Sequence, residues 1–419
     1  MLRIAMLSVH TSPLAQLGGK KTGGMNVYVR EVARTLGEAG HHVDVFTRED
    51  SPATQGCIVS INSNARVIHL PAGPLQTLDP AAIYRHLPQF RDALLAFADE
   101  HKQHYDVIYS HYWLSGWVAL ALKETWKIPV VQMFHTLGRM KDRIAGTETP
   151  LTPSTIMLHE RNIRVTVETE IMNLSDCLIA ATPAEQMQML WLYRATRRQI
   201  AVIPPGVDLE HFHPIDHNLA RSRIGLAPHQ RTLLFVGRIE PLKGVDILCN
   251  ALATLKDSQP DLLSDLMIHI VGGEPDNAEV GRLRALCNTL GLNDLVCFFG
   301  AKSQDELPYY YSAAEALIMP SDYESFGMVA LEAMACGTPV IASQVGGLAF
   351  LIQDDETGYH VPVREPKALA QRIATLLADK EKRRTMGINA RRVAETYSWE
   401  TIAQQLTEAF CSVLPTACH

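Results

Sequence analysis

Two glutamates are the first residues whose types and spacing could do chemistry. Glu324 and Glu332 lie in an otherwise apolar stretch that is followed by Gly337 and Pro339, a helix-stop signal. If Phe326 to Ala335 forms a helix, Glu324 lies in the loop before it and Glu332 about two turns inside it. Both carboxylates can then face one ligand at the N-terminal end of the helix. The alternative is that Glu324 caps the helix and Glu332 is exposed.

The start of this helix is itself a candidate anion site. Ser325 and Gly327 stand beside it. A helix N-terminus offers free N–H groups and a positive dipole end, which suit a phosphate or a sugar oxygen. Pro339 to Ser343 is short, apolar and partly β-branched, so we expect a buried strand after the helix.

Arg238 and Lys243 form a second candidate group, of positive charge. Arg238 follows the apolar run that ends in Val236-Gly237, and Lys243-Gly244 comes within the same loop. A departing diphosphate carries charge that a forked guanidinium and a mobile ammonium can stabilise. The alternative is a pair of solvated surface cations.

A glycine-rich loop, residues 18–26, precedes an expected helix from Val27 to Ala39. Gly23 and Gly24 would let the backbone approach a ligand closely. The loop does not match G-x-G-x-x-G, so it does not indicate a dinucleotide. A purely structural turn is the alternative.

His135 follows the expected strand Val130 to Phe134, at the end where parallel strands present ligand-binding residues. A lone histidine there is often only a structural hydrogen-bonding group. Several cationic residues follow it. They are Arg139, Lys141, Arg143, His159, Arg161 and Arg164. If several converge, they suit an acceptor that bears a phosphate. A surface ion-pair ladder with Glu168 on one helix face is the alternative.

The elements that must position these residues alternate between apolar runs and amphipathic segments, which predicts an α/β fold with parallel sheets. The expected strands of the first half are Ile4–Val9, His42–Phe46, Val67–Leu70, Val107–Tyr109, Val130–Phe134, Cys177–Ala181 and Ile200–Ile203. Residues 209–228 are polar and read as a linker. The expected strands of the second half are Thr232–Val236, Met267–Val271, Val296–Phe299, Ala316–Met319 and Val340–Ala342.

Composition bounds the class of protein. The 419 residues are 47% hydrophobic and 20% charged with a net charge of −7, so they predict two or three globular domains and no general nucleic-acid surface. The eight cysteines are scattered singly, which is typical of a reduced, cytoplasmic protein and not of a metal site. No apolar run reaches the ~20 residues of a membrane span. Residues 191–198 mix aromatic and basic side chains; we favour a solvated helix end over membrane contact.

The string from Pro320 to Gly347 resembles the donor site of retaining glycosyltransferases of family 4. The resemblance implies the GT-B fold, in which two Rossmann-like domains face each other across a cleft. It implies an acceptor-binding domain of residues 1–213, to which residues 400–419 cross back, and a nucleotide-sugar-binding domain of residues 214–399.

The same resemblance assigns roles to the donor-site residues. It implies that Glu332 holds the ribose hydroxyls, and that Arg238 and Lys243 hold the diphosphate. Glu324 would contact the donor sugar together with the backbone of Ser325, Phe326, Gly327 and Met328. Gly23 and Gly24 would lie near the diphosphate and the acceptor. His135, in a His-Thr-Leu-Gly string, would hydrogen-bond the transferred sugar.

Two related families take phosphorylated acceptors, and the sequence resembles both. Sucrose-phosphate synthases use fructose 6-phosphate, and mycothiol-pathway transferases use inositol 3-phosphate. Lys141 and Arg164 match phosphate-contacting positions in both, and we add Tyr112, Thr136, Arg139 and Asn26 to this acceptor set. Residues 10–13, 23–26 and 111–116 favour the inositol type. Pro80 replaces an expected phosphate-binding lysine, which favours the sucrose type.

We therefore expect a cytoplasmic retaining enzyme that transfers glucose from UDP-glucose to fructose 6-phosphate. N-acetylglucosamine transfer from its UDP-sugar to inositol 3-phosphate is the second reading. A nucleotide-sugar 2-epimerase and a non-catalytic sugar-nucleotide binder represent other classes. No Asp-x-Asp motif is present, so we expect neither a metal ion nor a cofactor. The sequence leaves the oligomeric state open.

Overall fold

The computed structural model describes residues 1–15, 23–140, 155–227, 230–274 and 277–415, with no side chains for 155–161. The described residues up to 204 and from 399 onward form one compact unit, here unit 1, and residues 205–398 form unit 2. The predicted boundary between the two domains follows residue 213. The observed boundary lies earlier because the connecting segment packs on unit 2: the Val207 N–H donates to the Tyr397 carbonyl at 2.8 Å, and the Phe212 ring lies 6.1 Å from Tyr311.

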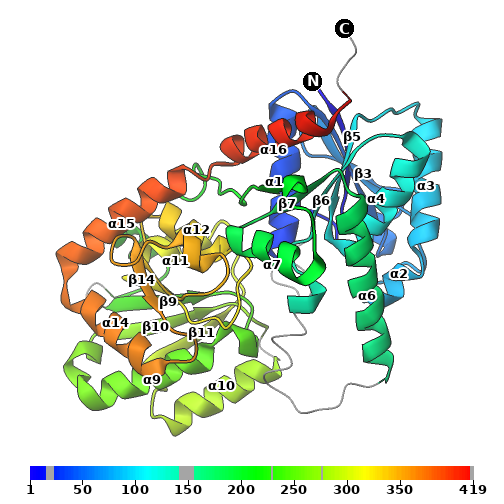
Figure 1. Ribbon diagram of the computed structural model, residues 1–419. Coiled ribbons are helices and arrows are strands. Elements are labelled where there is room, and N and C mark those ends of the chain that lie inside the picture. The colour runs from blue at the N-terminus through cyan, green and yellow to red at the C-terminus, as the bar shows by residue number, and fades with distance from the viewer. Residues whose placement is uncertain (16–22, 141–154, 228–229, 275–276, 416–419) are drawn as a thin grey trace. The chain divides into compact units, whose positions relative to one another are not determined.

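Unit 1 is built on an eight-stranded sheet of order β3-β4-β2-β1-β5-β6-β7-β8 (Figure 1). Its strands are β1 (Arg3–Leu7), β2 (His42–Arg48), β3 (Ile58–Ser60), β4 (Ala65–Leu70), β5 (Val107–His111), β6 (Val130–Met133), β7 (Cys177–Ala180) and β8 (Ile200–Val202). All neighbours pair in parallel except β3, which runs antiparallel to β4 at the edge.

Helices cover both faces of this sheet. They are α1 (Gly24–Glu38), α2 (Pro80–Tyr84), α3 (Leu87–Glu100), α4 (Tyr112–Trp126), α6 (Thr155–Leu174), α7 (Pro183–Tyr193) and α16 (Trp399–Val413). Successive strand residues point to opposite faces. Ala5 and Leu7 of β1 accordingly join a core with α3 and α4, whereas Ile4 and Met6 are buried outside that core.

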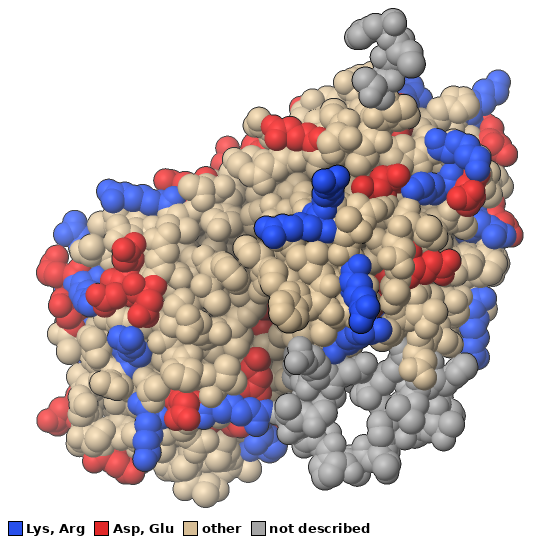
Figure 2. Space-filling view, in the orientation of Figure 1, with Lys and Arg blue, Asp and Glu red and all other residues tan. Residues whose placement is uncertain are grey.

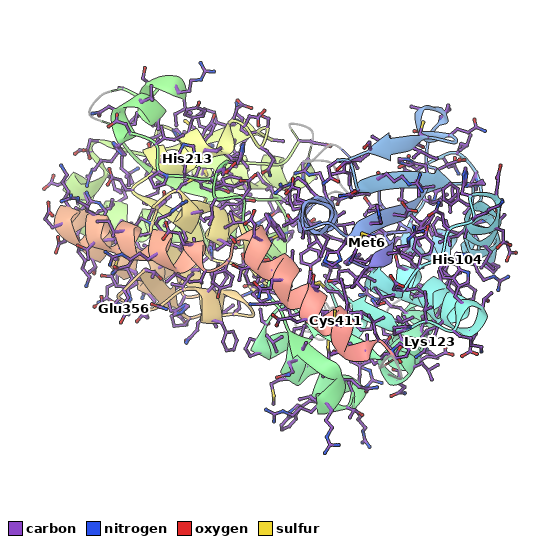
Figure 3. The ribbon with its side chains drawn as sticks, turned by 90° about the horizontal axis from the view of Figure 1, so that it is seen from above. Met6, His104, Lys123, His213, Glu356 and Cys411 are labelled. Carbon is purple, nitrogen blue, oxygen red and sulfur yellow. The ribbon has the colours of Figure 1, made fainter. Side chains whose placement is uncertain are left out.

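The C-terminal helix α16 belongs to unit 1, as the resemblance implied. It packs beside α1 and is labelled at Cys411 in Figure 3. Phe410 is fully buried with its ring 5.2 Å from that of Tyr109, and Trp399 lies 5.7 Å from Tyr28. Side chains of α16 thus pack against buried side chains of α1 and β5.

Unit 2 is built on a six-stranded parallel sheet of order β11-β10-β9-β12-β13-β14. Its strands are β9 (Arg231–Val236), β10 (Leu266–Val271), β11 (Val296–Gly300), β12 (Ala316–Met319), β13 (Val340–Ser343) and β14 (Gly358–Val361). Its helices are α8 (His217–Arg223), α9 (Val245–Ser258), α10 (Ala278–Thr289), α11 (Leu307–Ala313), α12 (Met328–Ala335), α13 (Leu348–Leu351), α14 (Pro366–Ala378) and α15 (Lys380–Glu395).

Two groups of helices cover this second sheet. Helices α9, α10 and α14 pack together over one apolar core, and α12 packs against α11 and α15. The predicted polar linker of residues 209–228 contains α8, so that interpretation was wrong for this part. Asp216 caps α8 by accepting from the N–H groups of Asn218 and Leu219, and Ala220 is buried.

The charged side chains and the cysteines are arranged as the amino-acid composition predicts. Basic and acidic side chains are interspersed on the face drawn in Figure 2. The seven cysteines in the described residues are free thiols. Among the helices that the structure describes, none has the length and apolar character needed to cross a membrane.

Candidate active site

In unit 2, the predicted donor residues follow two adjacent central strands. Arg238 comes after β9 and Glu324 after β12; β10 and β11 lie on the far side of β9, so the strand order reverses between β9 and β12. Open α/β sheets bind ligands outside the carboxyl ends of strands at such a reversal. The predicted donor residues therefore lie where open α/β sheets commonly bind ligands, and their contacts with a nucleotide sugar stay a prediction.

An ion pair joins the two loops. Lys243 ends a 3₁₀ turn, Pro241–Lys243, and its Nζ lies 2.5 Å from Glu324 Oε2. Both side chains are largely shielded from solvent. The next residue, Gly244, has a φ of +67°, and a Cβ there would lie 2.0 Å from the Pro320 carbonyl oxygen. The close packing of the two loops, which the ion pair needs, thus requires glycine at this position.

Gly346 and Gly347 hold the loop that carries Glu324 from the other side. Gly346 has a φ of +45°, and an added Cβ would stand 1.7 Å from the Glu324 carbonyl oxygen. A Cβ added at Gly347 would lie 2.2 Å from the Phe326 carbonyl oxygen. No side chain fits between these backbones, so the glycine pair fixes where Glu324 lies.

Helix α12 begins at Met328, two residues later than the predicted start at Phe326. Its N-cap is Gly327, with a φ of +105° and no side-chain hydrogen bond. Glu324 therefore does not cap the helix, which was the alternative interpretation. The N–H groups of the first turn remain available to an anion.

Glu332 is buried, with 6% of its surface exposed, so the alternative that it is simply exposed was wrong. Tyr311 donates its hydroxyl to Glu332 Oε2 at 2.7 Å. Burial raises the pKa of this carboxyl to about 7, and the tyrosine hydrogen bond opposes that rise. Its expected contact with ribose hydroxyls stays a prediction.

Arg238 is exposed, with 53% of its side-chain surface accessible, and its Nη1 lies 2.8 Å from Glu240 Oε1. Gly237 before it has a φ of +154°, and an added Cβ at Gly272 would lie 1.9 Å from the Gly237 carbonyl oxygen. The backbone next to Arg238 is thus closely packed, whereas its guanidinium is exposed and can reach a ligand.

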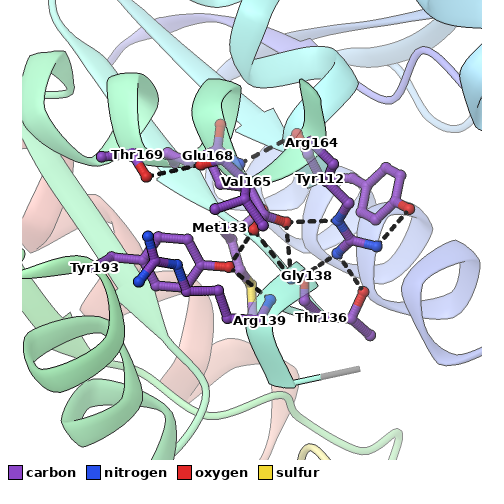
Figure 4. A network of polar contacts seen from close by, with 11 residues as sticks. Tyr112, Met133, Thr136, Gly138, Arg139, Arg164, Val165, Glu168, Thr169 and Tyr193 are labelled. Carbon is purple, nitrogen blue, oxygen red and sulfur yellow. Dashed lines mark hydrogen bonds and ion pairs between the residues drawn. The ribbon is translucent and has the colours of Figure 1, made fainter. Parts of the chain in front are cut away.

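In unit 1, three predicted acceptor residues come together around one guanidinium (Figure 4). Arg164 Nη1 donates to the Tyr112 hydroxyl at 3.2 Å, and Nη2 donates to the Thr136 carbonyl at 2.8 Å and to its hydroxyl at 3.3 Å. The guanidinium also lies 5.0 Å from the centre of the Tyr112 ring. Because Tyr112 and Thr136 follow β5 and β6, this cluster stands at the carboxyl end of the sheet.

Glu168 organises this cluster from helix α6. Its carboxylate is fully buried and lies 2.7 Å from Arg164 Nε, four residues earlier. It also accepts from the Gly138 N–H at 3.0 Å and from the Tyr193 hydroxyl. The predicted ladder between Arg164 and Glu168 therefore exists as an ion pair, but inside the protein and not on its surface.

Two other predicted acceptor residues point elsewhere. Arg139 donates from Nη1 to the Leu192 carbonyl at 2.6 Å and stacks 5.1 Å from the Tyr193 ring, away from Thr136 in Figure 4. The Asn26 amide donates to Thr11 Oγ1 at 2.7 Å and to the Ser12 carbonyl at 2.8 Å. Both side chains thus have partners within the protein, and their contact with an acceptor stays a prediction. Lys141, with Arg143, His159 and Arg161, lies outside the residues or side chains described.

His135 follows β6 in an unusual backbone conformation. Its φ is +62°, and the Thr136 N–H donates to the Phe134 carbonyl at 2.7 Å, which closes a tight γ-turn around the histidine. Non-glycine residues with such a φ cost energy and concentrate at functional sites. Burial lowers the pKa of His135 to about 3, with a smaller contribution from His10. The imidazole is therefore neutral at pH 7 and suited to hydrogen bonding.

Gly23 and Gly24 form the start of α1, which is longer than the predicted helix. Gly23 is the N-cap, and a Cβ there would meet no atom within 4 Å. The residues that the structure describes thus leave space around Gly23. Asn26 Oδ1 accepts the Gly23 N–H at 3.1 Å, which satisfies the backbone donor at the start of the helix.

Family models match both halves of the chain. The model "Glycosyl transferase 4-like domain" covers residues 23–206, and "Glycosyl transferases group 1" covers residues 216–393. The D-inositol 3-phosphate glycosyltransferase of Geodermatophilus obscurus is 40% identical over 412 residues, 97% of this chain and 89% of that protein. The chain belongs to glycosyltransferase family 4. Its two Rossmann-like units are those of the GT-B fold, as predicted.

Other members of the family are similar over nearly the whole chain. The D-inositol 3-phosphate glycosyltransferase of Corynebacterium glutamicum is 38% identical over 98% of this chain and 96% of its own. Among solved structures, the sucrose-phosphate synthase of Thermosynechococcus elongatus superposes with a TM-score of 0.87 at 35% identity, covering 98% and 99%. Anabaena HepE in complex with UDP-glucose has a TM-score of 0.72 at 22% identity and supports the fold alone.

Three contacts in this family 4 glycosyltransferase are not predicted by its sequence. Tyr311 holds Glu332, Tyr193 holds Glu168, and the His111 imidazole lies next to that of His135. No spacing signal in the sequence connects the tyrosines with those glutamates. The four-residue spacing of Arg164 and Glu168 was visible, but periodicity alone did not distinguish a buried pair from an exposed one.

Proposed function

We propose that this protein transfers a sugar, with retention of configuration, from a UDP-sugar to a small phosphorylated polyol or sugar. The observation that carries the proposal is the Lys243–Glu324 ion pair at the strand reversal of unit 2, beside the uncapped N-terminus of α12. A cation, a sugar-binding carboxylate and free N–H groups together form a binding set for a nucleotide sugar.

Each donor-site residue has one task in this proposal. Arg238 and Lys243 stabilise the diphosphate as the glycosidic bond breaks, and Glu324 accepts hydroxyls of the transferred sugar. Glu332 accepts ribose hydroxyls through the carboxylate that Tyr311 holds. These charges supply the electrostatic stabilisation, so the reaction needs no divalent metal.

The reaction runs on the sugar face from which UDP departs. The acceptor hydroxyl forms the new bond to the anomeric carbon while the bond to the diphosphate oxygen breaks. The hydroxyl proton passes to the departing phosphate. This route needs no carboxylate nucleophile, and Glu324, already paired with Lys243, serves as a ligand for the sugar.

The acceptor phosphate binds at Arg164, Tyr112 and Thr136. The Glu168 ion pair offsets the charge of Arg164, so the guanidinium acts here mainly as an oriented hydrogen-bond donor. The hydroxyls of Tyr112 and Thr136 add two further groups that can donate to phosphate oxygens. Lys141 is proposed to supply the net positive charge.

Inositol 3-phosphate, with UDP-N-acetylglucosamine as donor, is our first acceptor. The relatives that are 38–40% identical are named D-inositol 3-phosphate glycosyltransferases, and this reverses the order that the sequence analysis favoured. Fructose 6-phosphate with UDP-glucose is the second candidate. The sucrose-phosphate synthase structure supports it, as does Pro80, which begins α2 where a lysine was expected.

A matrix of two donors and two acceptors tests the proposal. Each UDP-sugar is incubated with inositol 3-phosphate, fructose 6-phosphate or neither, and products are identified by mass spectrometry. We expect a glycosylated phosphate and UDP in one pairing only. UDP released equally without an acceptor supports the epimerase instead, and binding without turnover supports a sugar-nucleotide binder.

A further inference from the structure

Two histidines contact each other at the carboxyl ends of neighbouring strands in unit 1. His111 ends β5 and His135 follows β6, and His111 Nδ1 lies 3.1 Å from His135 Nε2. The role of His135 toward the sugar belongs to the proposed function, and the inference below rests on it. His111 has no role in the mechanism above.

The His111 ring is enclosed on its other sides. It is fully buried, 4.3 Å from the Tyr109 ring and 5.7 Å from the Tyr28 ring in edge arrangements. Its second nitrogen, Nε2, is buried without a hydrogen-bond partner among the described residues. His135 is therefore the sole hydrogen-bond partner that the described structure gives the His111 ring.

Both rings are neutral at pH 7. Burial lowers the pKa of His111 well below its usual value, and that of His135 to about 3. Two neutral imidazoles that share a hydrogen bond place one proton between them. The position of that proton decides which nitrogen of each ring carries hydrogen.

The two possible arrangements differ at the buried Nε2 of His111. If His135 donates, His111 must carry its proton on Nε2, where a buried N–H lacks an acceptor. If His111 donates from Nδ1, the buried Nε2 is only an unused acceptor. Buried N–H groups without partners are the rarer case in proteins. The enclosure of His111 therefore favours donation from His111 to His135.

This arrangement determines which ring nitrogen of His135 carries the proton. With Nε2 accepting, its proton is on Nδ1, which has no hydrogen-bond partner among the described residues. We propose that His111 is a positioning residue that holds the His135 ring and sets its tautomer, so that His135 presents an Nδ1–H donor to an oxygen of the transferred sugar.

The backbone conformation at Tyr112 and His135 helps to hold the two histidine rings in place. Tyr112, next to His111, has a φ of +71°, and His135 has a φ of +62°. Left-handed conformations at two non-glycine residues persist only where the surroundings hold them. The fold therefore keeps the two imidazoles at a defined separation before any ligand binds.

Nitrogen NMR on the full-length protein tests the tautomer directly. In protein labelled with ¹⁵N-histidine, two-bond ¹H–¹⁵N spectra distinguish Nδ1–H from Nε2–H forms, and His135→Asn assigns the signal. We expect His135 in the Nδ1–H form, and a shift toward the Nε2–H form in His111→Phe. His135 protonated on Nε2 in the unaltered protein overturns the proposal, whether or not any transfer activity is found.

Kinetics test the consequence for the sugar. His111→Phe should lower kcat about 100-fold with little change in the donor KM, because a misplaced catalytic contact acts mainly on the transition state. His111→Asn keeps a donor near the Nδ1 position and should recover most of the rate. The control is Tyr109→Phe, which removes the buried hydroxyl 2.7 Å from that of Tyr28 but not the histidine pair. Equal losses in all three variants indicate a merely structural role and overturn the proposal.

Discussion

Tyr311 donates its hydroxyl to Glu332 Oε2 at 2.7 Å, and both side chains are buried between α11 and α12. The Glu332 carboxyl has a pKa of about 7 in the folded protein, whereas an unperturbed glutamate has a pKa of 4.5. As the pH rises, this carboxyl therefore ionises at a lower pH in the unfolded chain than in the folded protein. Between these pH values the unfolded state binds fewer protons, and stability falls as the pH rises.

Glu332→Gln should remove this dependence. Relative to the unaltered protein, the variant should gain stability progressively from pH 4.5 to 7, by at most roughly 3 kcal/mol, and hold that gain above pH 7. Urea unfolding of both proteins at pH 5 and pH 8 measures the difference. A stability difference that is the same at both pH values contradicts the raised pKa.

Arg238→Ala should depress turnover at least ~100-fold, because a diphosphate would lose its forked donor as it departs. Since the side chain is half-exposed, the thermal midpoint should change little. Arg384→Ala, which removes an exposed arginine paired with Glu381 on α15, is the matched control. Turnover within about twofold of normal would remove Arg238 from the diphosphate site.

Lys243 and Glu324 should act as one unit. Lys243→Met should weaken donor binding, and Glu324→Gln should lower kcat by about 100-fold. Because each side chain positions the other through a 2.5 Å contact, the double variant should lose less than the product of the single losses. If the loss of kcat/KM in the double variant equals the product of the two single losses, Lys243 and Glu324 act independently during catalysis.

Arg164→Ala should raise the KM for a phosphorylated acceptor about tenfold or more, the cost of a charge-assisted hydrogen bond. Its effect on an unphosphorylated acceptor should be smaller, which separates phosphate recognition from loss of structure. Arg139→Ala is the control, because its guanidinium is bonded to Leu192 instead. If both arginine variants change KM equally, the phosphate site is wrongly placed.

Metal removal should leave the reaction unaffected. The proposed electrostatic stabilisation comes from Arg238, Lys243 and the first turn of α12, so excess EDTA should leave the rate unchanged and added Mg²⁺ or Mn²⁺ should not raise it. An EDTA-sensitive rate that Mn²⁺ restores contradicts this prediction.

The strands that the sequence predicted well are the buried ones. Val130–Met133 and Ala316–Met319 are short apolar runs with buried side chains throughout, and hydrophobicity alone marks them. Ile58–Ser60 was missed because it is an exposed antiparallel edge strand. Gly358–Val361 was missed because its Gly-Tyr-His sequence is not an apolar run, although β13 pairs with it fully.

The candidate site was predictable as far as it depends on local sequence. Glu324 and Lys243 each stand in a loop next to a strand end, and the strand order brings those loops together. The contacts of Glu168 with Tyr193 and of Glu332 with Tyr311 join distant segments, so only the tertiary fold reveals them. The contact of Arg139 with Leu192 was not predicted, because proximity in sequence to Thr136 does not determine the direction of a long side chain.

The docking of α16 on unit 1 has a consequence for biosynthesis. The ribosome releases residues 1–204, then all of unit 2, and only afterwards the segment whose Trp399 and Phe410 lie against Tyr28 and Tyr109. Until residues 399–410 have been synthesised, those two tyrosines lack the contacts with Trp399 and Phe410. Unit 1 therefore cannot complete its packing around these tyrosines until the segment that follows unit 2 has been synthesised.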